Sequence, residues 1–257
     1  MKNRPIVLSI AGFDPSGGAG LLADVKTFET IKVYGYGVQT ALTWQNEQEF
    51  QRVQWHALED IISQVEILFK TTHVGFVKIG LIENATIFGE ILSFLHHKNP
   101  RVKIIWDPIL QASAGFDFHS TSSASEWKIN MSKLYLFTPN WLELQWLSQN
   151  LDGELGAEHL ARYCHVYLKG GHRPHKQGYD YLVTKESTTK EGKPKAYFFR
   201  PKSQGVFAKH GSGCVLSSAI LAYLAKGYPL HRACLLAKQY TTRFLSSNEH
   251  LLGYHVR

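Results

Sequence analysis

The sequence predicts an α/β fold in which a mostly parallel central sheet is covered by helices on both faces. Short apolar runs that end in turn residues recur along the chain, which is the pattern of strands buried in a parallel sheet. Amphipathic segments separate these runs, and a chain that alternates strand and helix makes right-handed crossovers that lay helices over the sheet. The runs that we expect to be strands are IVLSIAG (6–12), VGFVKIG (74–80), KIIWDP (103–108), KLYLFTPN (133–140) and VYLKGG (166–171).

The segments between and beside these strands are predicted as follows. Residues 57–69 place their apolar side chains at spacings of three and four, which predicts a helix with one buried stripe. Residues 34–55 predict a strand that leads into an edge strand, and residues 179–200 predict a polar hairpin. Because no repeat or Gly/Ser linker divides the 257 residues, we expect a single domain over residues 1–257.

Composition and charge limit the kinds of partner. A formal net charge of +7 and an isoelectric point near 9.2 suit anionic ligands such as nucleotides or phosphates. Lys and Arg are scattered, without a basic helix, zinc-finger spacing or aromatic RNA-binding signature, so we expect no nucleic-acid partner. No apolar run approaches the roughly 20 residues that span a bilayer. Three cysteines without a C-x-x-C pair favour a reducing compartment, and we expect a cytoplasmic protein without membrane contact.

A glycine-rich segment before an apolar helix is the first candidate site. In sheets of this kind ligands bind beyond the carboxyl ends of the strands. Gly211-Ser212-Gly213 precedes a long apolar helix, so its backbone N–H groups and the helix dipole favour an anion such as phosphate. The Lys-Ser/Thr pair of a Walker A loop is absent. The alternative is a flexible turn that leads into a core helix.

Cys214 follows this segment directly and has two interpretations. An apolar helix is an ordinary place for a buried, inert cysteine. A thiol in the first helical turn beside an anion site is instead expected to have a lowered pKa. Such a thiolate would accept the proton of a substrate hydroxyl that attacks a phosphoryl group, a reaction that depends mainly on positioning and charge neutralisation.

Acidic residues near other turns supply further candidates. Asp14 is expected to cap the turn of DPSGG, whereas Asp24 is either a solvated or capping carboxylate or a ligand contact. Asp107 ends a strand, where a carboxylate would hold Mg²⁺ or a phosphate-bound metal. In TPNWLEL we expect Thr138 as N-cap and Pro139 as the first helical residue, which places Asn140 and Glu143 on one helix face towards the same cleft. Oxygen ligands without histidine spacing suit Mg²⁺ better than zinc.

Seven motifs together resemble, in order, one known family. AGFDPSGGAGLLADVKTF, VYGYGVQTALTWQNE, VKIGL, DPIL, TPNWLEL, VYLKGGH and HGSGCVLSSAI are similar to the hydroxymethylpyrimidine/phosphomethylpyrimidine kinases of thiamine biosynthesis, from about residue 6 to residue 225. That family has the ribokinase-like fold. The resemblance implies that ATP phosphorylates 4-amino-5-hydroxymethyl-2-methylpyrimidine and then its monophosphate. It also implies a homodimer.

The resemblance assigns roles to individual positions. Cys214 would be the catalytic base, and Gly211, Ser212 and Gly213 would form the anion hole. Asp24 and Gln45 would recognise the aminopyrimidine, in a pocket lined by Gly12, Leu81 and Ile109. Asp107, Asn140 and Glu143 would interact with Mg²⁺ and the phosphates, and Lys169 would lie near the nucleotide.

Two single-residue departures from the family pattern and two alternatives accompany this interpretation. Ser212 stands where the family usually has Thr, and Glu47 stands where it usually has Thr, which places an extra acid beside the pocket. The alternative activity is pyridoxal kinase, since the B6 ring also bears a hydroxymethyl group, although many pyridoxal kinases carry aspartate at the position of Cys214. A binding or regulatory protein without turnover is the alternative class, and it would have no need of a base or a metal site.

Overall fold

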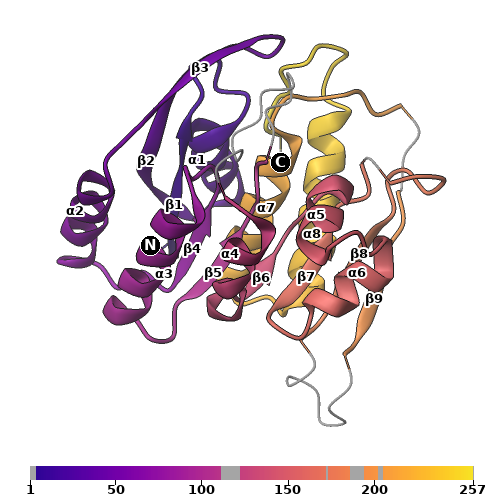
Figure 1. Cartoon of the computed structure of the whole chain (residues 1–257). Helices are drawn as coiled ribbons and strands as arrows, with labels where there is room; N and C mark the ends of the chain where they lie inside the picture. Colours follow the sequence, from indigo (N-terminus) through magenta and orange to yellow (C-terminus); the bar gives the residue numbers. More distant parts are fainter. Residues whose placement is uncertain (1–3, 111–121, 172, 186–193, 202–204, 257) are drawn as a thin grey trace.

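The computed structural model describes residues 4–110, 122–171, 173–185, 194–201 and 205–256, which form one nine-stranded sheet between two layers of helices (Figure 1). The strand order is β3-β2-β1-β4-β5-β6-β7-β8-β9. The strands are β1 (Ile6–Phe13), β2 (Tyr34–Gln45), β3 (Phe50–Trp55), β4 (Phe76–Ile79), β5 (Lys103–Trp106), β6 (Leu136–Phe137), β7 (His165–Leu168), β8 (Asp180–Val183) and β9 (Ala196–Phe199).

The central strands β2, β1, β4, β5, β6 and β7 pair in parallel, and only the flanking pairs β2–β3, β7–β8 and β8–β9 are antiparallel. The five predicted strands are confirmed, although the sheet uses only two residues, Leu136 and Phe137, of the run at 133–140. The two irregular regions are also confirmed, because β3 is an edge strand that pairs with β2, and β8 and β9 form the hairpin within residues 179–200.

The helices divide between the two faces of the sheet. They are α1 (Gly20–Ile31), α2 (Leu58–Phe69), α3 (Ala85–Lys98), α4 (Ala124–Ile129), α5 (Trp141–Ser148), α6 (Gly153–Leu160), α7 (Ser212–Ala225) and α8 (Leu230–Leu245), with a 3₁₀ turn at Met131–Lys133. Helices α1, α7 and α8 pack together on one face, and α2 to α6 follow one another across the other. The predicted helix at 57–69 is α2, which begins one residue later.

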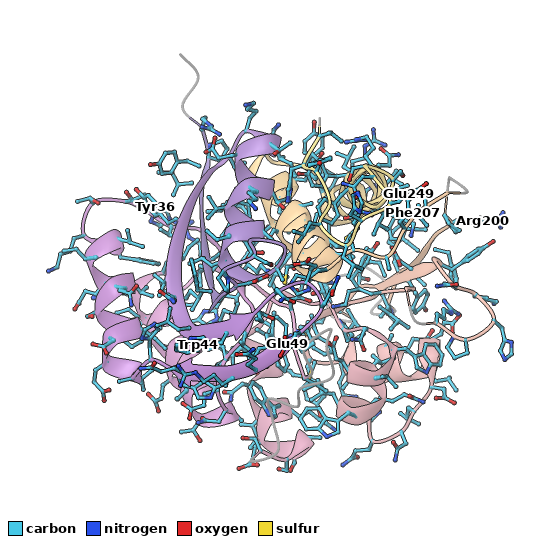
Figure 2. The ribbon with its side chains drawn as sticks, turned by 90° about the horizontal axis from the view of Figure 1, so that it is seen from above. Tyr36, Trp44, Glu49, Arg200, Phe207 and Glu249 are labelled. Atoms are coloured by element: carbon cyan, nitrogen blue, oxygen red, sulfur yellow. The ribbon has the colours of Figure 1, made fainter. Side chains whose placement is uncertain are left out.

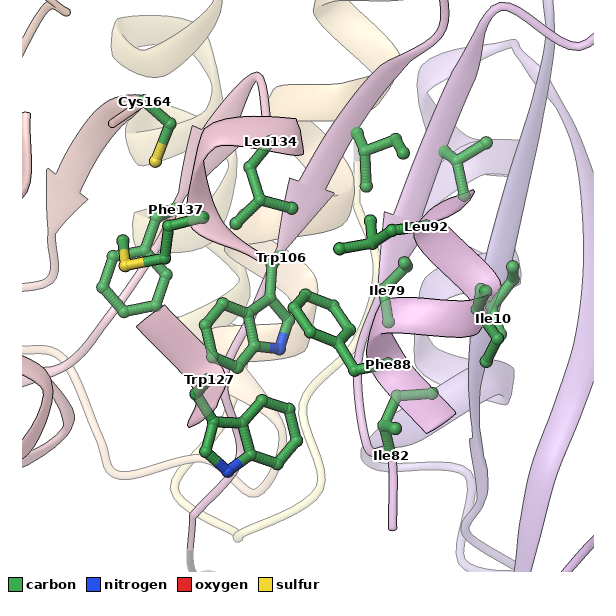
Figure 3. Packing of buried hydrophobic residues seen from close by; sticks show 14 of the residues in the cluster. Ile10, Ile79, Ile82, Phe88, Leu92, Trp106, Trp127, Leu134, Phe137 and Cys164 are labelled. Carbon is green, nitrogen blue, oxygen red and sulfur yellow. The ribbon is translucent and has the colours of Figure 1, made fainter. Parts of the chain in front are cut away.

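Each face has its own apolar core, because successive side chains of a strand point to opposite faces. In β5, Ile104 and Trp106 point towards the α2–α6 face, and Ile105 points towards α1, α7 and α8. Figure 3 shows the centre of the α2–α6 core, where the Trp106 and Trp127 rings stack 5.2 Å apart and Phe88 packs 4.6 Å from Trp106. Such aromatic contacts stabilise the fold beyond simple burial.

The parallel strands bring their carboxyl ends to one edge of the sheet. Strand β1 lies between β2 and β4, so the strand order reverses there, and ligands of open α/β sheets bind beside such a reversal. Figure 2 views the molecule from above, with Trp44 and Glu49 on the β2–β3 hairpin and Phe207 and Glu249 on the segments around α7 and α8. The turns after β1, β4, β5, β6 and β7 therefore share this edge.

Candidate active site

The amino termini of α1 and α7 meet at this edge through two glycine-rich segments. Gly211, the N-cap of α7, has φ = +74°, a conformation that glycine adopts without the penalty of a side chain. A Cβ atom at Gly211 would also collide with the carbonyl oxygen of Gly18, so the two backbones are in direct contact. Position 211 therefore requires glycine for two reasons.

Asp14 fixes the first of these segments and ties it to the second. Its carboxylate accepts hydrogen bonds from the backbone N–H groups of Ser16 (2.9 Å) and Ala19 (2.8 Å), which confirms the predicted turn cap. The same carboxylate lies 2.8 Å from His210 Nε2, immediately before Gly211. Asp14 therefore joins segments that are nearly two hundred residues apart in the sequence.

The second glycine segment opens towards Lys169. Gly211, Ser212 and Gly213 are partly exposed, whereas the following residues of α7 are buried. A Cβ atom at Gly213 would lie 3.4 Å from Lys169 Nζ, and, apart from its own helix and chain neighbours, it would meet no other heavy atom of the described residues within 4 Å. The amino terminus of α7, which favours anions, therefore faces a space bordered by an ammonium group.

Lys169 is held by two carboxylates. Its Nζ lies 2.8 Å from Asp107 Oδ1 and 3.5 Å from Glu143 Oε2. Burial lowers the pKa of Lys169, but the charges of Asp107 and Glu143 outweigh burial and hold the pKa above its ordinary value. The ammonium is thus charged at any physiological pH, and its side chain keeps 14% of its surface exposed.

Asn140 and Glu143 form the cap of α5. The Asn140 side chain accepts a hydrogen bond from the Glu143 N–H (2.9 Å), and Glu143 Oε2 accepts one from the Asn140 N–H (2.6 Å), which is a capping box. The predictions of Thr138 as N-cap and Pro139 as the first helical residue were therefore wrong: the helix begins at Trp141. Burial raises the pKa of Glu143 to about 7, with Asp107 adding to the rise and Lys169 opposing it.

The acidic residues fit Mg²⁺ less directly than the sequence suggested. Asp107 is buried, and its oxygens are engaged by Lys169 and by the hydroxyls of Ser217 (3.0 Å) and Thr138 (3.3 Å). We therefore revise its assignment from metal ligand to ion-pair partner of Lys169. Among the residues that the structure describes, no group of three or more His, Cys, Asp or Glu side chains is placed to hold a metal ion.

Cys214 lies in the first turn of α7, directly below the glycine segment. It is 6% exposed, and its sulfur accepts a hydrogen bond from the backbone N–H of Gly20, the first residue of α1. Burial raises the pKa of the thiol to about 11, although Lys78 opposes the rise. The expected lowered pKa is therefore corrected, because loss of solvent outweighs the two helix termini and the nearby cation.

Residues predicted for the pyrimidine pocket fall into two groups. A Cβ atom at Gly12 would lie 2.9 Å from Leu81, and one at Gly80 would lie 3.9 Å from Ile109, so these positions adjoin the ends of β1, β4 and β5. Gln45 donates to Thr43 Oγ1 (2.9 Å), which in turn donates to the Phe13 carbonyl oxygen (2.8 Å). Gln45 is thereby tied to the end of β1.

Asp24 belongs to the second group, because it has no exposed surface. Its carboxylate lies 2.5 Å from Lys78 Nζ and accepts hydrogen bonds from Ser9 (2.6 Å) and Ser218 (2.6 Å). The solvated or capping alternative was therefore wrong. We also revise the assignment of Asp24 as a pyrimidine contact, since its oxygens are committed to partners inside the protein.

Sequence reasoning did not select Lys78, Ser217, Ser218 or His210. Lys78 had a visible signal, since it is a lone charged residue in the apolar run VGFVKIG. Ser217 and Ser218 lie three and four residues after Cys214, a spacing that places them on the same face of α7. His210 had no signal of its own, because its link to Asp14 depends on the packing of the two segments.

Two open hollows lie farther along the chain, in the loop after β7. One has a volume of about 510 Å³ and is lined by Gly171, Arg173, His175 and Gln177. The other has a volume of about 410 Å³ and is lined by Arg173, His175, Lys176, Tyr179, Phe198 and Arg200. Neither includes a predicted site residue.

The mostly parallel sheet and the paired glycine segments, with a lysine and a thiol at one helix terminus, define a kinase of the ribokinase-like class. The family model of phosphomethylpyrimidine kinase matches residues 14–256. The chain belongs to the phosphomethylpyrimidine kinase family and is a phosphotransferase. The motif resemblance noted in the sequence is thereby confirmed.

Individual relatives agree with this assignment. The hydroxymethylpyrimidine/phosphomethylpyrimidine kinase of Aquifex aeolicus is 32% identical over 260 residues, covering 98% of each chain. The bifunctional thiamine biosynthesis protein ThiED of Geobacter sulfurreducens is 34% identical over 249 residues, and these cover 93% of this chain but only 49% of that protein.

Solved structures are also similar. The phosphomethylpyrimidine kinase of Clostridium difficile 630 has a TM-score of 0.75 at 31% identity, with 93% of this chain and 99% of that chain covered. The pyridoxal kinase of Staphylococcus aureus in complex with pyridoxal has a TM-score of 0.79, with 98% and 91% covered. At 22% identity, this second likeness shows the fold alone.

Proposed function

We propose that the protein transfers the γ-phosphoryl group of ATP to the hydroxymethyl group of 4-amino-5-hydroxymethyl-2-methylpyrimidine, and a second one to the resulting monophosphate. One observation carries the proposal: Gly213 at the start of α7, the Lys169 ammonium and the Cys214 thiol come together at the sheet edge. Phosphoryl transfer depends mainly on positioning and on charge stabilisation, and this arrangement supplies both.

Each of these groups has a task in the proposed reaction. The N–H groups of Gly211, Ser212 and Gly213 bind the transferred phosphoryl oxygens, and Lys169 neutralises their charge from the side. Cys214 accepts the proton of the attacking hydroxyl. Because its pKa is about 11, only a small fraction of the thiol is ionised at neutral pH. A nearby cation that stabilises the thiolate therefore favours this proton transfer.

The pyrimidine is proposed to bind at the ends of β1, β4 and β5. Gly12, Leu81 and Ile109 form its apolar surroundings, and glycine at position 12 lets the Leu81 side chain pack directly against the end of β1. The Gln45 amide pairs with the amino and ring-nitrogen edge, for which it has both a donor and an acceptor. Asp24 is not proposed to contact the pyrimidine, because it has no exposed surface.

ATP and Mg²⁺ are the proposed nucleotide and metal. Solved structures of pyridoxal kinases with ADP and with AMP-PCP are among the similar folds, and kinase activity itself implies a nucleotide. Asn140 lies beside the phosphates. Glu143 would help to hold Mg²⁺, a cation that keeps several waters and otherwise binds phosphate oxygens. The metal would neutralise phosphate charge during transfer.

We further propose that the chain acts as one domain, as a homodimer and in the cytoplasm. A single sheet that includes strands from both halves of the chain supports one domain. Within the described residues, no helix is long and apolar enough to cross a membrane. Light scattering of the purified protein tests the dimer, which requires twice the 29.1 kDa chain mass.

The activity is tested by an assay that couples ATP consumption to three acceptors, measured side by side: the aminopyrimidine alcohol, its monophosphate and pyridoxal. We expect turnover with the first two, dependent on Mg²⁺ and indifferent to zinc chelation. Lys169→Met is the matched control, and it should abolish turnover with every acceptor. Turnover with pyridoxal alone would replace the proposed substrate, and ATP binding without turnover on any acceptor would indicate a binding protein.

A further inference from the structure

Lys78 is a charged residue where the sheet otherwise places an apolar side chain. Its neighbours in β4, Val77 and Ile79, point into the α2–α6 core, so Lys78 points to the opposite face, beneath α1 and α7. The side chain has no exposed surface. A buried ammonium is costly unless it is paired and hydrogen-bonded, so its partners indicate what it does.

The first partner is Asp24 of α1, whose carboxylate lies 2.5 Å away. Burial lowers the pKa of Lys78, but Asp24 and the nearby Asp107 outweigh burial and hold that pKa above its ordinary value. If neutralising Asp24 were the whole role, the pair would resemble many buried ion pairs that apolar residues can replace with little loss of stability. Lys78, however, also lies near a second carboxylate.

The second partner is Asp107, whose Oδ2 lies 4.0 Å from Lys78 Nζ. The same oxygen accepts the hydrogen bond of Ser217 (3.0 Å), and the other oxygen of Asp107 binds Lys169 (2.8 Å). Asp107 thus lies between the buried ammonium of Lys78 and the ammonium of Lys169, which borders the anion site. Ser217 belongs to α7, one turn after Cys214.

Resting on the function proposed above, we propose that Lys78 is a positioning residue for phosphoryl transfer: its buried ammonium fixes Asp107, and with it Lys169, and places a permanent positive charge beneath Cys214. Lys169 faces the ligand and is partly exposed, whereas Lys78 has no exposed surface and reaches no ligand. Lys78 therefore acts through its neighbours.

Four charged groups act on the Cys214 thiol from the elements packed around it. Lys78 of β4 favours the ionised thiol, as does Lys169 after β7. Asp107 after β5 and Asp24 of α1 disfavour it. The two members of the Lys78–Asp24 pair therefore act on this thiol with opposite signs, although the loss of either breaks the same ion pair.

This opposition gives a test that separates positioning from simple structural support. Lys78→Met and Asp24→Asn are compared with the unaltered protein by the rate of iodoacetamide modification between pH 7 and 10, resolved to the Cys214 peptide by mass spectrometry. Alkylation follows the thiolate fraction. We expect Lys78→Met to slow modification about tenfold or more at each pH, as one pKa unit would, and Asp24→Asn to accelerate it.

Turnover is measured on the same variants. Lys78→Met should lower kcat about tenfold or more and change KM for ATP by less than about threefold, because the ligand-facing groups remain. If Lys78→Met does not fold, the double variant Lys78→Met/Asp24→Asn removes both charges, and its kcat should still be reduced because Asp107 has lost its lower partner.

A purely structural role predicts different results. Both single variants would then change the rate of Cys214 modification in the same direction, in proportion to their loss of thermal stability. The double variant would recover kcat as well as stability. Either result would overturn the proposal. The modification assay needs neither substrate nor nucleotide, so it stays informative even if the acceptor assay shows that the proposed kinase activity is absent.

Discussion

Replacing Gly213 by alanine should raise the stability of the protein and lower its activity. Gly213 is the second residue of α7, and its φ is not positive, so alanine can adopt the same backbone. Alanine also has fewer unfolded conformations to lose than glycine. We therefore expect a gain of about 0.4–1 kcal/mol in the free energy of unfolding, or about 1–4 °C in Tm for a chain of this size.

The added methyl group should at the same time block the anion site. It would lie 3.4 Å from Lys169 Nζ, in the space that the helix terminus faces. Alanine keeps the backbone N–H, but its methyl group would hold the transferred group away from this donor. Loss of one preorganised donor costs about 10²–10³-fold in kcat, so we expect a loss of that size. The assay is kcat and KM for ATP with saturating aminopyrimidine, beside a calorimetric Tm.

Gly211→Ala is the matched control. Its positive φ and its contact with the Gly18 carbonyl mean that alanine there adds about 1–2 kcal/mol of backbone strain before the collision is relieved. Both stability and kcat should therefore fall. If Gly213→Ala keeps kcat within twofold of the unaltered protein, the anion does not bind at this terminus and the reasoning fails.

Three further predictions concern single side chains. Cys214→Ser should lower kcat about 10²-fold and remove the rise of kcat between pH 7 and 9.5 that a base of pKa about 11 produces; an inert cysteine would leave kcat within a few fold. Because the pKa of Glu143 is raised from 4.5 to about 7, the folded protein keeps a proton that the unfolded chain loses, so stability falls as pH rises through this window. The free energy of unfolding, measured in urea at pH 5 and pH 8, should fall by up to about 3 kcal/mol less in Glu143→Gln than in the unaltered protein. An equal fall in the variant and in the unaltered protein would contradict the raised pKa. Phe88→Ala, measured by the same unfolding, should cost about 3–5 kcal/mol through the cavity left beside Trp106; less than 1 kcal/mol would mean that the core collapses to fill it.

The sequence predicted the fold well because strand and helix periodicity is a local property. The runs at 6–12 and 103–108 alternate with amphipathic segments, and the residues that follow them lie at one sheet edge whatever the details of packing. The start of α5 was placed wrongly, because Thr138 and Asn140 are both acceptable caps and only the reciprocal bonds with Glu143 decide between them.

The roles of the site residues remain predictions, and their electrostatics could not be read from the sequence. The family resemblance selected Cys214 and Asp24, but the pKa of one and the accessibility of the other depend on burial, which only the packing of α1 and α7 with the sheet determines. The same packing makes Lys78 a partner of both Asp24 and Asp107. A sequence pattern does not contain the distances that set the sign of such effects.

The contact between the two glycine segments has a consequence for biosynthesis. Asp14 and His210 are 196 residues apart, and Asp24 and Ser218 are 194 apart, yet each pair is hydrogen-bonded. While the chain emerges from the ribosome, Asp24, Lys78 and the part of the sheet face that α7 and α8 cover therefore stay uncovered until these helices are made. Such long-range closure is slow and leaves the intermediate prone to aggregation. We therefore expect that rare codons placed just before residue 212 lower the soluble yield without changing the finished enzyme, and that a chaperone acting during translation restores the yield.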